Sequence, residues 1–344
     1  MSKEPPEPTA LISAEQKALA TRIIEMAEDL GGTTLEDRRR RELPDPDPEE
    51  WGHRWLNYVL ATELLHIAMM IPGTNLHTAP DTLAHMLPHP TTDQPATVPE
   101  MVRLWRMTEP LATYRLPWIP DVTGHSAPGG VALDLPELAQ LQESIMGWVG
   151  AIPAEDSVEI AKNGDRKNGV WLAAPPLEKW QEEGLVHVTT GRGKTKEKKL
   201  IHHPAGVFCL IPTGVERKKT AAFFTPEVLA TFTAQQAIET LIDEGTITQA
   251  DDWLSLSINE PSVGSGAILS HTIRLVAEKY LDMKQEELGR TIPADEFVIE
   301  LQKAKQFFAH RVTGVDLNPG SVKIAEIALW IDTIIPTHTK ENAA

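Results

Sequence analysis

The sequence is almost without cysteine: its 344 residues contain one, Cys209. A single cysteine excludes a disulfide within the chain and a cysteine-based zinc cluster. Long apolar runs are missing too, since the run around residues 64–73 (LLHIAMMIPG) is far too short to span a bilayer. The first residues, MSKEPPEPTALIS, show no basic stretch followed by an apolar run, so no secretion signal is expected. The simplest expectation is a cytoplasmic protein.

Positive charge is also scarce. Lysine and arginine number 32 against 49 aspartates and glutamates, which gives a net charge of −17. This balance argues against a protein that coats nucleic acid non-specifically. The basic residues nevertheless gather in one strip, which comprises Arg192, Lys194, Lys196, Lys198, Lys199, Arg217, Lys218 and Lys219. Two interpretations stay open for this strip: a local phosphate-binding face or a solvated loop.

The composition is that of a globular protein, with 41% hydrophobic and 24% charged residues, and the length allows two or three domains. We expect an α/β protein in three segments. Residues 1–150 should form a mainly helical N-terminal domain, which carries no motif that indicates its role. Residues 151–206 should form a small α+β segment with the basic loop, and residues 207–344 an α/β domain.

Several helices are predicted in the first two segments. A first helix follows the capping-box spacing of Ser13 and Gln16 and should end at Gly31 and Gly32. A second should start at Asp47-Pro48, an N-cap residue followed by proline in the first turn. Further helices are predicted over Leu133 to Val149 and over Pro176 to Gly184.

The runs LVHVTT and KLIHH, on either side of the basic loop, predict strands joined as a hairpin, and GVFCLIP predicts a third strand. A helix followed by strand, basic loop and strand is also the profile of a winged-helix DNA-binding module. This second interpretation is weaker because no clear recognition helix precedes the strands.

Three histidines, His77, His85 and His89, raise the question of a metal site. Pro80 and Pro88 break any regular helical spacing between them, and no carboxylate motif accompanies them. We therefore expect no metal site.

The last third of the chain contains two strand–turn–helix patterns. The first places a strand over Ser255 to Ile258, a turn with Gly264 and Gly266, and then a helix. The second places a strand over Val312 to Leu317 and a helix after Pro319. Two such patterns in tandem predict adjacent parallel strands in a doubly wound sheet.

An acidic residue, Asp316, closes the second predicted strand. In doubly wound folds an acidic side chain at this place accepts hydrogen bonds from ribose hydroxyls. The alternative is that Asp316 and the residues after it form only a turn and a helix cap. The turn with Gly264 and Gly266 matches neither the dinucleotide fingerprint, because the third glycine is absent, nor a P-loop. An NAD-dependent oxidoreductase is therefore a weaker alternative.

Three motifs, taken in order, resemble those of the S-adenosylmethionine-dependent adenine-N6 DNA methyltransferases. They are RKKTAAFFTP (residues 217–226), EPSVGSGAIL (260–269) and GVDLNPGSVKIAEIALWI (314–331). The likeness covers about residues 207–336 and is greatest to the large type IIG enzymes and the BREX and DISARM phage-defence groups. It implies the first half of a Rossmann-like methyltransferase sheet and site-specific methylation of adenine in double-stranded DNA, with S-adenosyl-L-methionine (SAM) as cofactor.

The resemblance also implies which residues hold the cofactor. Glu260 would bind the methionine ammonium and Asp316 the two ribose hydroxyls. The other residues so implied are Thr225 and Pro226 at the methionine carboxylate, Pro261, Gly264 and Gly266 at the turn beneath the cofactor, and Asn318 beside the adenine. The chain departs from the family at Ala221, where glycine is usual, and at Glu260, where aspartate is usual.

The catalytic tetrad of this family, Asn/Asp/Ser-Pro-Pro-aromatic, does not occur in the sequence, and APPL and LNPG are the nearest strings. We therefore expect no catalytic residue here and two possible origins: the N-terminal part of a longer enzyme, or one subunit whose partner carries the tetrad. A non-catalytic DNA- or SAM-binding protein derived from a methyltransferase is the alternative. In each case the residues expected at DNA phosphates are Arg192, Lys194, Lys196, Lys198 and Lys199.

Overall fold

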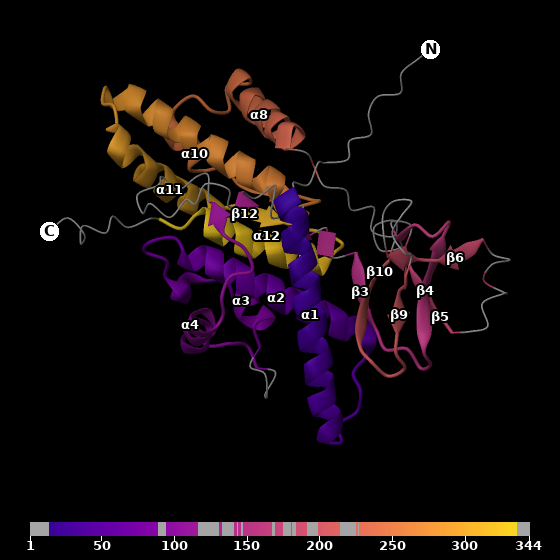
Figure 1. The fold of residues 1–344 in the computed structure, drawn as a ribbon. Helices are drawn as coiled ribbons and strands as arrows, with labels where there is room; N and C mark the ends of the chain where they lie inside the picture. Colours follow the sequence, from indigo (N-terminus) through magenta and orange to yellow (C-terminus); the bar gives the residue numbers. More distant parts are fainter. Residues whose placement is uncertain are drawn as a thin grey trace, which may run out of the picture. The chain divides into compact units, whose positions relative to one another are not determined.

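The computed structural model describes residues 14–88, 94–115, 131–132, 141–142, 144–145, 147–166, 169–174, 180, 184–190, 199–213, 225 and 227–335 (Figure 1). They form an α/β protein, as expected. The chain divides into two compact units: Met1–Leu19, Ala61–Gln142 and Phe224–Ala344 form unit 1, and Ala20–Leu60 and Glu143–Phe223 form unit 2. These units group residues by contact, whereas the three segments expected above divide the chain along its length, and those segment boundaries stay a prediction.

Helix α1 (Ala14–Arg40) continues through Gly31 and Gly32, so the predicted end of the first helix is wrong. The reason is packing within unit 2. A Cβ atom on Gly31 would lie 2.5 Å from Cε1 of Phe208, so the glycine lets this ring approach the helix backbone. The carbonyl of Gly31 also accepts a hydrogen bond from Nε1 of Trp51 at 3.1 Å. Here glycine provides room for a neighbour inside a helix and does not end it.

Helix α2 (Pro48–Met69) begins where the Asp47-Pro48 signal predicted. The side chain of Asp47 acts as the cap: its Oδ1 accepts the backbone N–H groups of Glu49 and Glu50, each at 3.0 Å. These are two of the donors that a helix leaves without partners in its first turn.

The β-structure of unit 2 consists of short antiparallel strands. Strand β4 (Ser157–Lys162) pairs with three others, and two further pairs lie outside that sheet. The partners of β4 are β5 (Trp171–Ala173), β6 (Leu185–His187) and β9 (His202–His203); the separate pairs are β3 (Trp148–Ala151) with β10 (Cys209–Pro212) and β7 (Thr189–Thr190) with β8 (Lys199–Leu200). The β7–β8 pair confirms the predicted hairpin beside the basic loop. Each predicted strand is divided, however, because β6 and β9 pair with β4. Strand β10 is the third predicted strand.

The helix predicted over Leu133 to Val149 is wrong at its C-terminal end, because Trp148 and Val149 belong to β3. Val149 pairs with Ile211 of β10, so backbone pairing in the sheet overrides the helical spacing of the apolar residues. Residues 141–142 and 144–145 are helical. The helix predicted over Pro176 to Gly184 lies mostly outside the described residues; Trp180 is helical and Gly184 forms a turn.

A buried carboxylate lies in the β4 sheet. The side chain of Glu159 is fully buried and accepts hydrogen bonds from Arg166 at 2.6 and 2.7 Å and from Nε2 of His203 at 3.0 Å. Burial, the largest influence, acts to raise the pKa of Glu159, but the bonds from His203 and Arg166 together hold it below its ordinary value. The guanidinium of Arg166 also lies over the Trp148 ring, 5.3 Å from its centroid. These contacts tie β4 to β3 and β9.

The Glu159 contacts give unit 2 a pH-dependent stability. A carboxyl whose folded pKa is depressed stabilises the fold above its unfolded pKa, near 4.5, and this contribution is lost as the pH falls through the lower folded pKa. We expect Glu159→Gln to cost about 1.5–3 kcal/mol at neutral pH, the value of hydrogen bonds to a charged group, and less in acid.

Urea unfolding of both proteins at a series of pH values measures the difference. The comparison with the variant is needed because burial raises the pKa values of Glu28 and Glu63, which act with the opposite sign. A difference that is constant from neutral to acid pH would contradict this account of Glu159.

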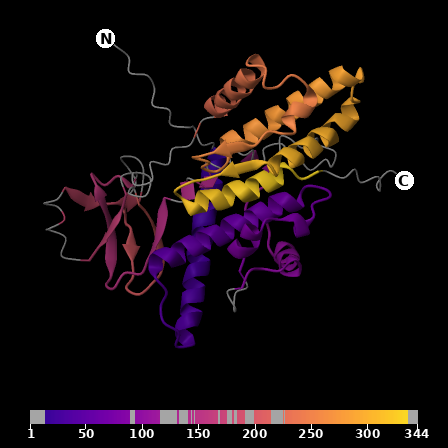
Figure 2. The same ribbon diagram turned by 180° about the vertical axis from the view of Figure 1, so that it is seen from behind.

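Unit 1 contains a layer of helices beside a short parallel sheet (Figures 1 and 2). From its middle segment come η1 (Leu76–Thr78), α3 (Asp81–Met86), α4 (Val98–Met107), β1 (Tyr114–Arg115) and β2 (Val131–Ala132). From its last segment come α8 (Glu227–Asp243), α9 (Ala250–Trp253), β11 (Ile258–Glu260), α10 (Ala267–Leu288), α11 (Ala294–Ala309), β12 (Val312–Gly314) and α12 (Pro319–Asp332). Helix α10 packs against α8, α9 and α11 around a core that includes Trp253, Ile273 and Phe308.

Strands β11 and β12 are parallel neighbours, as predicted, with Ile258 opposite Val312 and Glu260 opposite Gly314. Their predicted bounds are wrong. Ser255 and Leu256 donate backbone N–H bonds to the carbonyls of Asp252 and Trp253, at 3.2 and 3.1 Å, so they belong to the turn that follows α9. Strand β11 therefore starts at Ile258, and β12 ends at Gly314 instead of Leu317. The helices predicted after Gly266 and from Pro319 are α10 and α12.

A buried ion pair fixes the end of α12 to α11. Nζ of Lys305 lies 2.7 Å from Oδ1 of Asp332, and their side chains are 4% and 9% exposed. Ser270 of α10 also donates to Asp332, at 3.3 Å, and Gln302 donates to the carbonyls of Asp332 and Ile334, each at 3.0 Å. The charges are thus both paired and hydrogen-bonded, as buried charges must be.

Removing one partner of this ion pair should be costly. We expect Lys305→Ala to destabilise the fold by about 3–5 kcal/mol, because it leaves the Asp332 carboxylate buried without its cation. The matched control is Lys303→Ala, since the Lys303 side chain is 55% exposed and pairs with Glu300. It should cost less than about 1 kcal/mol. Chemical denaturation of the parent and the two variants measures the free energy of unfolding. Similar losses of stability in both variants would show that the buried ion pair does not make the difference.

No described helix combines the length and the apolar character that crossing a bilayer requires.

Candidate functional site

The carboxyl ends of β11 and β12 meet at one turn, which runs from Pro261 to Gly266 and leads into α10. The turn is bonded to the segment after β12, because the N–H of Val263 donates to the carbonyl of Val315 at 2.9 Å. Gly264 and Gly266 have φ values of 53° and 92°, in the left-handed region that favours glycine. The two sequence motifs that contain these residues are therefore brought together in space.

Asp316 joins the two turns through both of its carboxylate oxygens. Its Oδ2 accepts the backbone N–H of Gly264 at 2.9 Å, and its Oδ1 accepts that of Asn318 at 2.7 Å. The side chain is half-buried. An ionised carboxylate offers about four acceptor positions, so two backbone donors leave capacity for further donors.

Glu260, at the end of β11, contributes the second carboxylate of the site. It is half-buried, and its Oε1 accepts the backbone N–H of Ser262 at 3.2 Å. Pro261 follows it on the surface. The site thus carries two acidic side chains, Glu260 and Asp316, at the ends of adjacent strands.

The glycines of the turn serve two different purposes. A Cβ atom on Gly264 would meet nothing within 4 Å, so the backbone here borders open space. A Cβ on Gly266 would lie 3.2 Å from Cβ of Ala325, so Gly266 lets α12 approach the start of α10. The open space over Gly264 allows a ligand to reach the backbone between the two carboxylates.

Asn318 caps α12: its Oδ1 accepts the N–H of Gly320 at 2.9 Å. The structure therefore contains the turn and helix cap that were considered as the alternative interpretation of this segment. The cap uses Oδ1 of Asn318, and its side-chain amide group keeps two N–H donors.

The first motif falls largely outside the described residues, and so does Pro226. Thr225 is described and half-buried, and it precedes α8. Helix α8 is anchored beside the start of α10, where Oγ1 of Thr231 lies 3.4 Å from Nδ1 of His271. The residues predicted to contact DNA, Arg192, Lys194, Lys196 and Lys198, also lie outside the described residues. Lys199 pairs with Thr190 through its backbone in β8.

Other chemical groups do not form a competing site in the part of the chain described. The thiol of Cys209 is buried, and burial, with the nearby charges of Glu28 and Glu159, raises its pKa to about 12, so it is not a nucleophile at neutral pH. No group of three or more metal-ligating side chains occurs among these residues; His89 lies outside them.

A buried polar cluster on α2 serves packing. Glu63 accepts hydrogen bonds from the Tyr114 hydroxyl and from the N–H of Leu111, the latter at 3.0 Å, and burial raises its pKa. His66 pairs with Oγ1 of Thr108 at 3.0 Å, and burial lowers its pKa. Both pKa shifts favour the uncharged side chains. Glu63 and His66 thus act as buried hydrogen-bond partners that attach residues 108–114 to α2.

Sequence reasoning missed a close contact between the turn and β12, which joins Val263 and Gly314. A Cβ atom on Gly314 would lie 2.7 Å from Cγ2 of Val263, so glycine lets the Val263 side chain pack against the backbone of β12. Its place as the first residue of the third motif gives no hint of this, because the neighbour lies in a different motif.

No protein-family model, no curated protein and no solved structure matches this chain.

The contact at Gly314 generates a stability prediction. We expect Gly314→Ala to destabilise the fold by about 1–3 kcal/mol, the usual cost of overpacking. The double variant Gly314→Ala/Val263→Ala should recover part of the loss, because removing the Val263 methyl groups makes room for the new one. A double-mutant cycle on urea midpoints measures this coupling. Strictly additive effects would show that the two residues do not constrain each other.

Proposed function

We propose that the chain is the SAM-binding part of a site-specific adenine-N6 DNA methyltransferase of a restriction-modification or phage-defence system. The observation that carries the proposal is the pair of carboxylates, Glu260 and Asp316, at the carboxyl ends of the parallel strands β11 and β12, with the open glycine turn between them. In doubly wound sheets ligands bind at this end of the strands. We propose accordingly that the sheet is the first part of a Rossmann-like methyltransferase sheet.

The donors and acceptors of the site suit this cofactor. The free acceptor capacity of Asp316 suits the two hydroxyls of a ribose, and Glu260 offers a carboxylate to the methionine ammonium. The open backbone at Gly264 lets the cofactor lie close to the turn. We propose that Asn318, at the start of α12, contacts the adenine. When bound, SAM would supply the methyl group; the residues of this chain would bind and orient it.

Charge favours SAM over a dinucleotide. SAM has a sulfonium and an ammonium group and no phosphate, whereas NAD carries a pyrophosphate that would lie against the turn. Two carboxylates flank this turn, on a chain whose net charge is −17. They attract the cations of SAM and repel the pyrophosphate. The turn also lacks the third glycine of the dinucleotide fingerprint.

The catalytic groups and part of the DNA contact have to come from elsewhere under this proposal. Methylation of an adenine amino group requires a flipped base and a pocket that receives it. The Asn/Asp/Ser-Pro-Pro-aromatic tetrad that provides this pocket in the resembled family is absent from the 344 residues. We propose that a further segment or a separate subunit carries it, and that the basic residues from Arg192 to Lys199 contact DNA phosphates.

The missing tetrad is also the observation that favours a second candidate function. A protein that binds SAM or DNA without transferring a methyl group would need the carboxylates and the basic strip but no tetrad. The two candidates agree on the cofactor site and differ in whether a tetrad-bearing partner restores chemistry.

The cofactor contact can be tested by calorimetry. We expect the chain to bind SAM or its demethylated product, and Asp316→Ala to weaken binding roughly ten- to a hundred-fold, which corresponds to about 1.5–3 kcal/mol for bonds to a charged acceptor. The matched control is Asp282→Ala, an exposed carboxylate on α10, which should leave affinity unchanged. Equal affinity of the Asp316 variant and the parent for SAM would show that Asp316 does not contact the cofactor.

Methyl transfer separates the two candidate functions. We expect no transfer of tritiated methyl from SAM to DNA by this chain alone, and transfer once a polypeptide that carries the tetrad is added, because only then is the base pocket complete. Transfer by the chain alone would mean that its catalytic residues lie elsewhere in this sequence. SAM binding without transfer in any combination would favour the non-catalytic candidate.

A further inference from the structure

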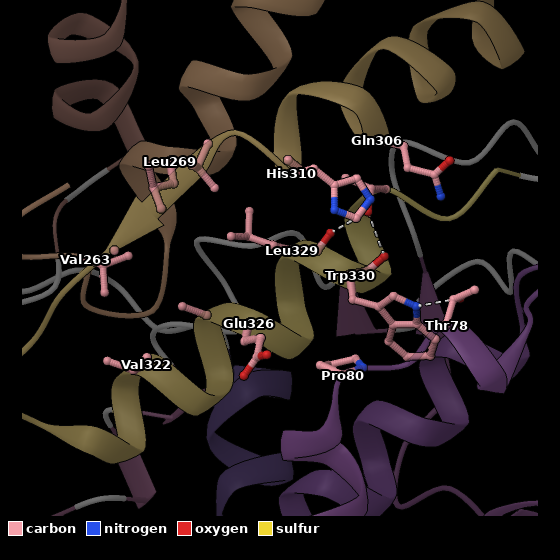
Figure 3. A pocket seen from close by; sticks show the side chains of 15 residues that line it. Thr78, Pro80, Val263, Leu269, Gln306, His310, Val322, Glu326, Leu329 and Trp330 are labelled. Carbon is pink, nitrogen blue, oxygen red and sulfur yellow. Dashed lines mark hydrogen bonds between the residues drawn. The ribbon is translucent and has the colours of Figure 1, made fainter. Parts of the chain in front are cut away.

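The face of helix α12 that carries Glu326 and Trp330 is bonded to residues 76–86, the segment that comprises η1 and α3. Oγ1 of Thr82 donates to Oε2 of Glu326, and Nε1 of Trp330 donates to Oγ1 of Thr78 at 3.2 Å. Figure 3 shows the second bond as a dashed line, beside a cavity of about 600 Å³. The two bonds join residues that lie 244 and 252 positions apart in the chain. They therefore connect N-terminal residues, whose role no motif indicates, with the part of the chain that carries the candidate site.

The bonds reach α12 next to its contact with the turn of the site. A Cβ atom on Gly266 would lie 3.2 Å from Cβ of Ala325, the residue before Glu326. Ala325 also belongs to a small apolar core with Val263 of the same turn. Two consecutive residues of α12 therefore contact the turn and the 76–86 segment, so α12 cannot shift at one contact without moving at the other.

The 76–86 segment is held in place by its own contacts. The side chain of Asn75 caps η1, and its backbone carbonyl accepts the Thr78 hydroxyl at 2.8 Å. The same hydroxyl oxygen keeps its lone pairs for the indole N–H of Trp330, which can only donate. Leu83 of α3 is fully buried. The segment thus offers α12 an acceptor whose orientation is already fixed.

The directed bonds at Glu326 and Trp330 limit movements of α12 that its other contacts permit. Van der Waals contact with Gly266 fixes a distance but no direction, whereas hydrogen bonds also depend on angle. The Lys305–Asp332 ion pair holds only the far end of the helix. By the rise of an α-helix, the first turn of α12 lies about 20 Å from Asp332 but about 10 Å from Glu326. The same tilt therefore moves that turn about half as far when the helix is held at Glu326.

We propose that the 76–86 segment is a positioning element of the cofactor site. By holding α12 at Glu326 and Trp330, it keeps Asn318 and the start of the helix in place relative to Gly264. Binding sites need their groups placed within about 0.5 Å, which a small tilt of α12 would exceed. The segment touches no ligand and acts through α12. This inference rests on the proposed function and deepens it, because it makes part of the N-terminal half a component of SAM binding.

The test compares the double variants Thr78→Ala/Thr82→Ala and Thr78→Ser/Thr82→Ser, which remove and keep the two hydroxyls. Both variants retain the local fold, because the Thr78 N–H still donates to the Asn75 carbonyl at 3.0 Å and no side chain caps α3. We expect the alanine pair to weaken SAM binding roughly three- to thirtyfold, the size of coupling from residues without ligand contact. The serine pair should bind as the parent does. Titration calorimetry measures these affinities.

Amide hydrogen exchange without cofactor tests the inference independently of SAM. The N–H groups of Gly264 and Asn318 both donate to Asp316, so their exchange rates report the order of the site. We expect faster exchange at both in the alanine pair and parent rates in the serine pair. The rate at Val276, in the middle of α10, should stay the same in all three proteins. A merely structural role would raise exchange at Val276 as well.

The matched control is Thr240→Ala, an exposed threonine of α8 whose hydroxyl bonds only within its own helix in the contacts described. It should change neither affinity nor exchange. Parent affinity in the alanine pair, parent exchange rates at Gly264 and Asn318, or an equal rise at Val276 would overturn the positioning role. If the parent itself binds no SAM, the proposed function fails, and the exchange rates alone decide whether the 76–86 segment positions the turn.

Discussion

The hydrogen bonds of Asp316 hold the candidate site together. Its carboxylate accepts the N–H group of Asn318 and that of Gly264, which lies 52 residues before Asp316 in the chain. The helices α10 and α12 start directly after the turns that contain Gly264 and Asn318. One side chain thus sets the relative position of two strand ends and two helix starts. A ligand at Asp316 would meet acceptors that are already oriented, which reduces the ordering cost of binding.

Buried charge has a parallel role in both units, though with different partners. In unit 2, Glu159 of β4 pairs with Arg166 and with His203 of β9. In unit 1, Lys305 and Asp332 attach the end of α12 to α11. In both cases the ionised groups keep their hydrogen-bond partners inside the protein, so the cost of desolvation is offset. Such pairs fix which segments meet, while the apolar cores supply most of the free energy of folding.

Local signals in the sequence predicted the start of α2 and much of the last third of the chain. Asp47-Pro48 marked the start of α2, and the two strand–turn–helix patterns predicted β11 and β12 as parallel neighbours followed by α10 and α12. Their success has a physical basis: caps, tight turns and apolar periodicity are set by residues close in sequence. The sequence also singled out Glu260, Gly264 and Asp316, which the fold does bring to one place.

The errors came from contacts between residues far apart in the chain. Gly31 was predicted to end α1, but its role is to make room for the Phe208 ring. That contact joins residues far apart in the sequence and cannot be inferred from the neighbours of Gly31. Val149 was assigned to a helix because its strand partner, Ile211, cannot be inferred from neighbouring residues. The bonds of Thr78 and Thr82 to α12 were not foreseen for the same reason.

The burial of Cys209 has a practical consequence for following the folding of unit 2. A lone thiol with a pKa of about 12, bonded to the carbonyl of Ala151 at 3.6 Å, is protonated and shielded as long as β3 and β10 stay paired. Thiol reagents act on thiolates, so alkylation of this chain requires that pair to open. The rate of alkylation of Cys209 then reports how often the β3–β10 pair of unit 2 opens, and the measurement needs no change to the sequence.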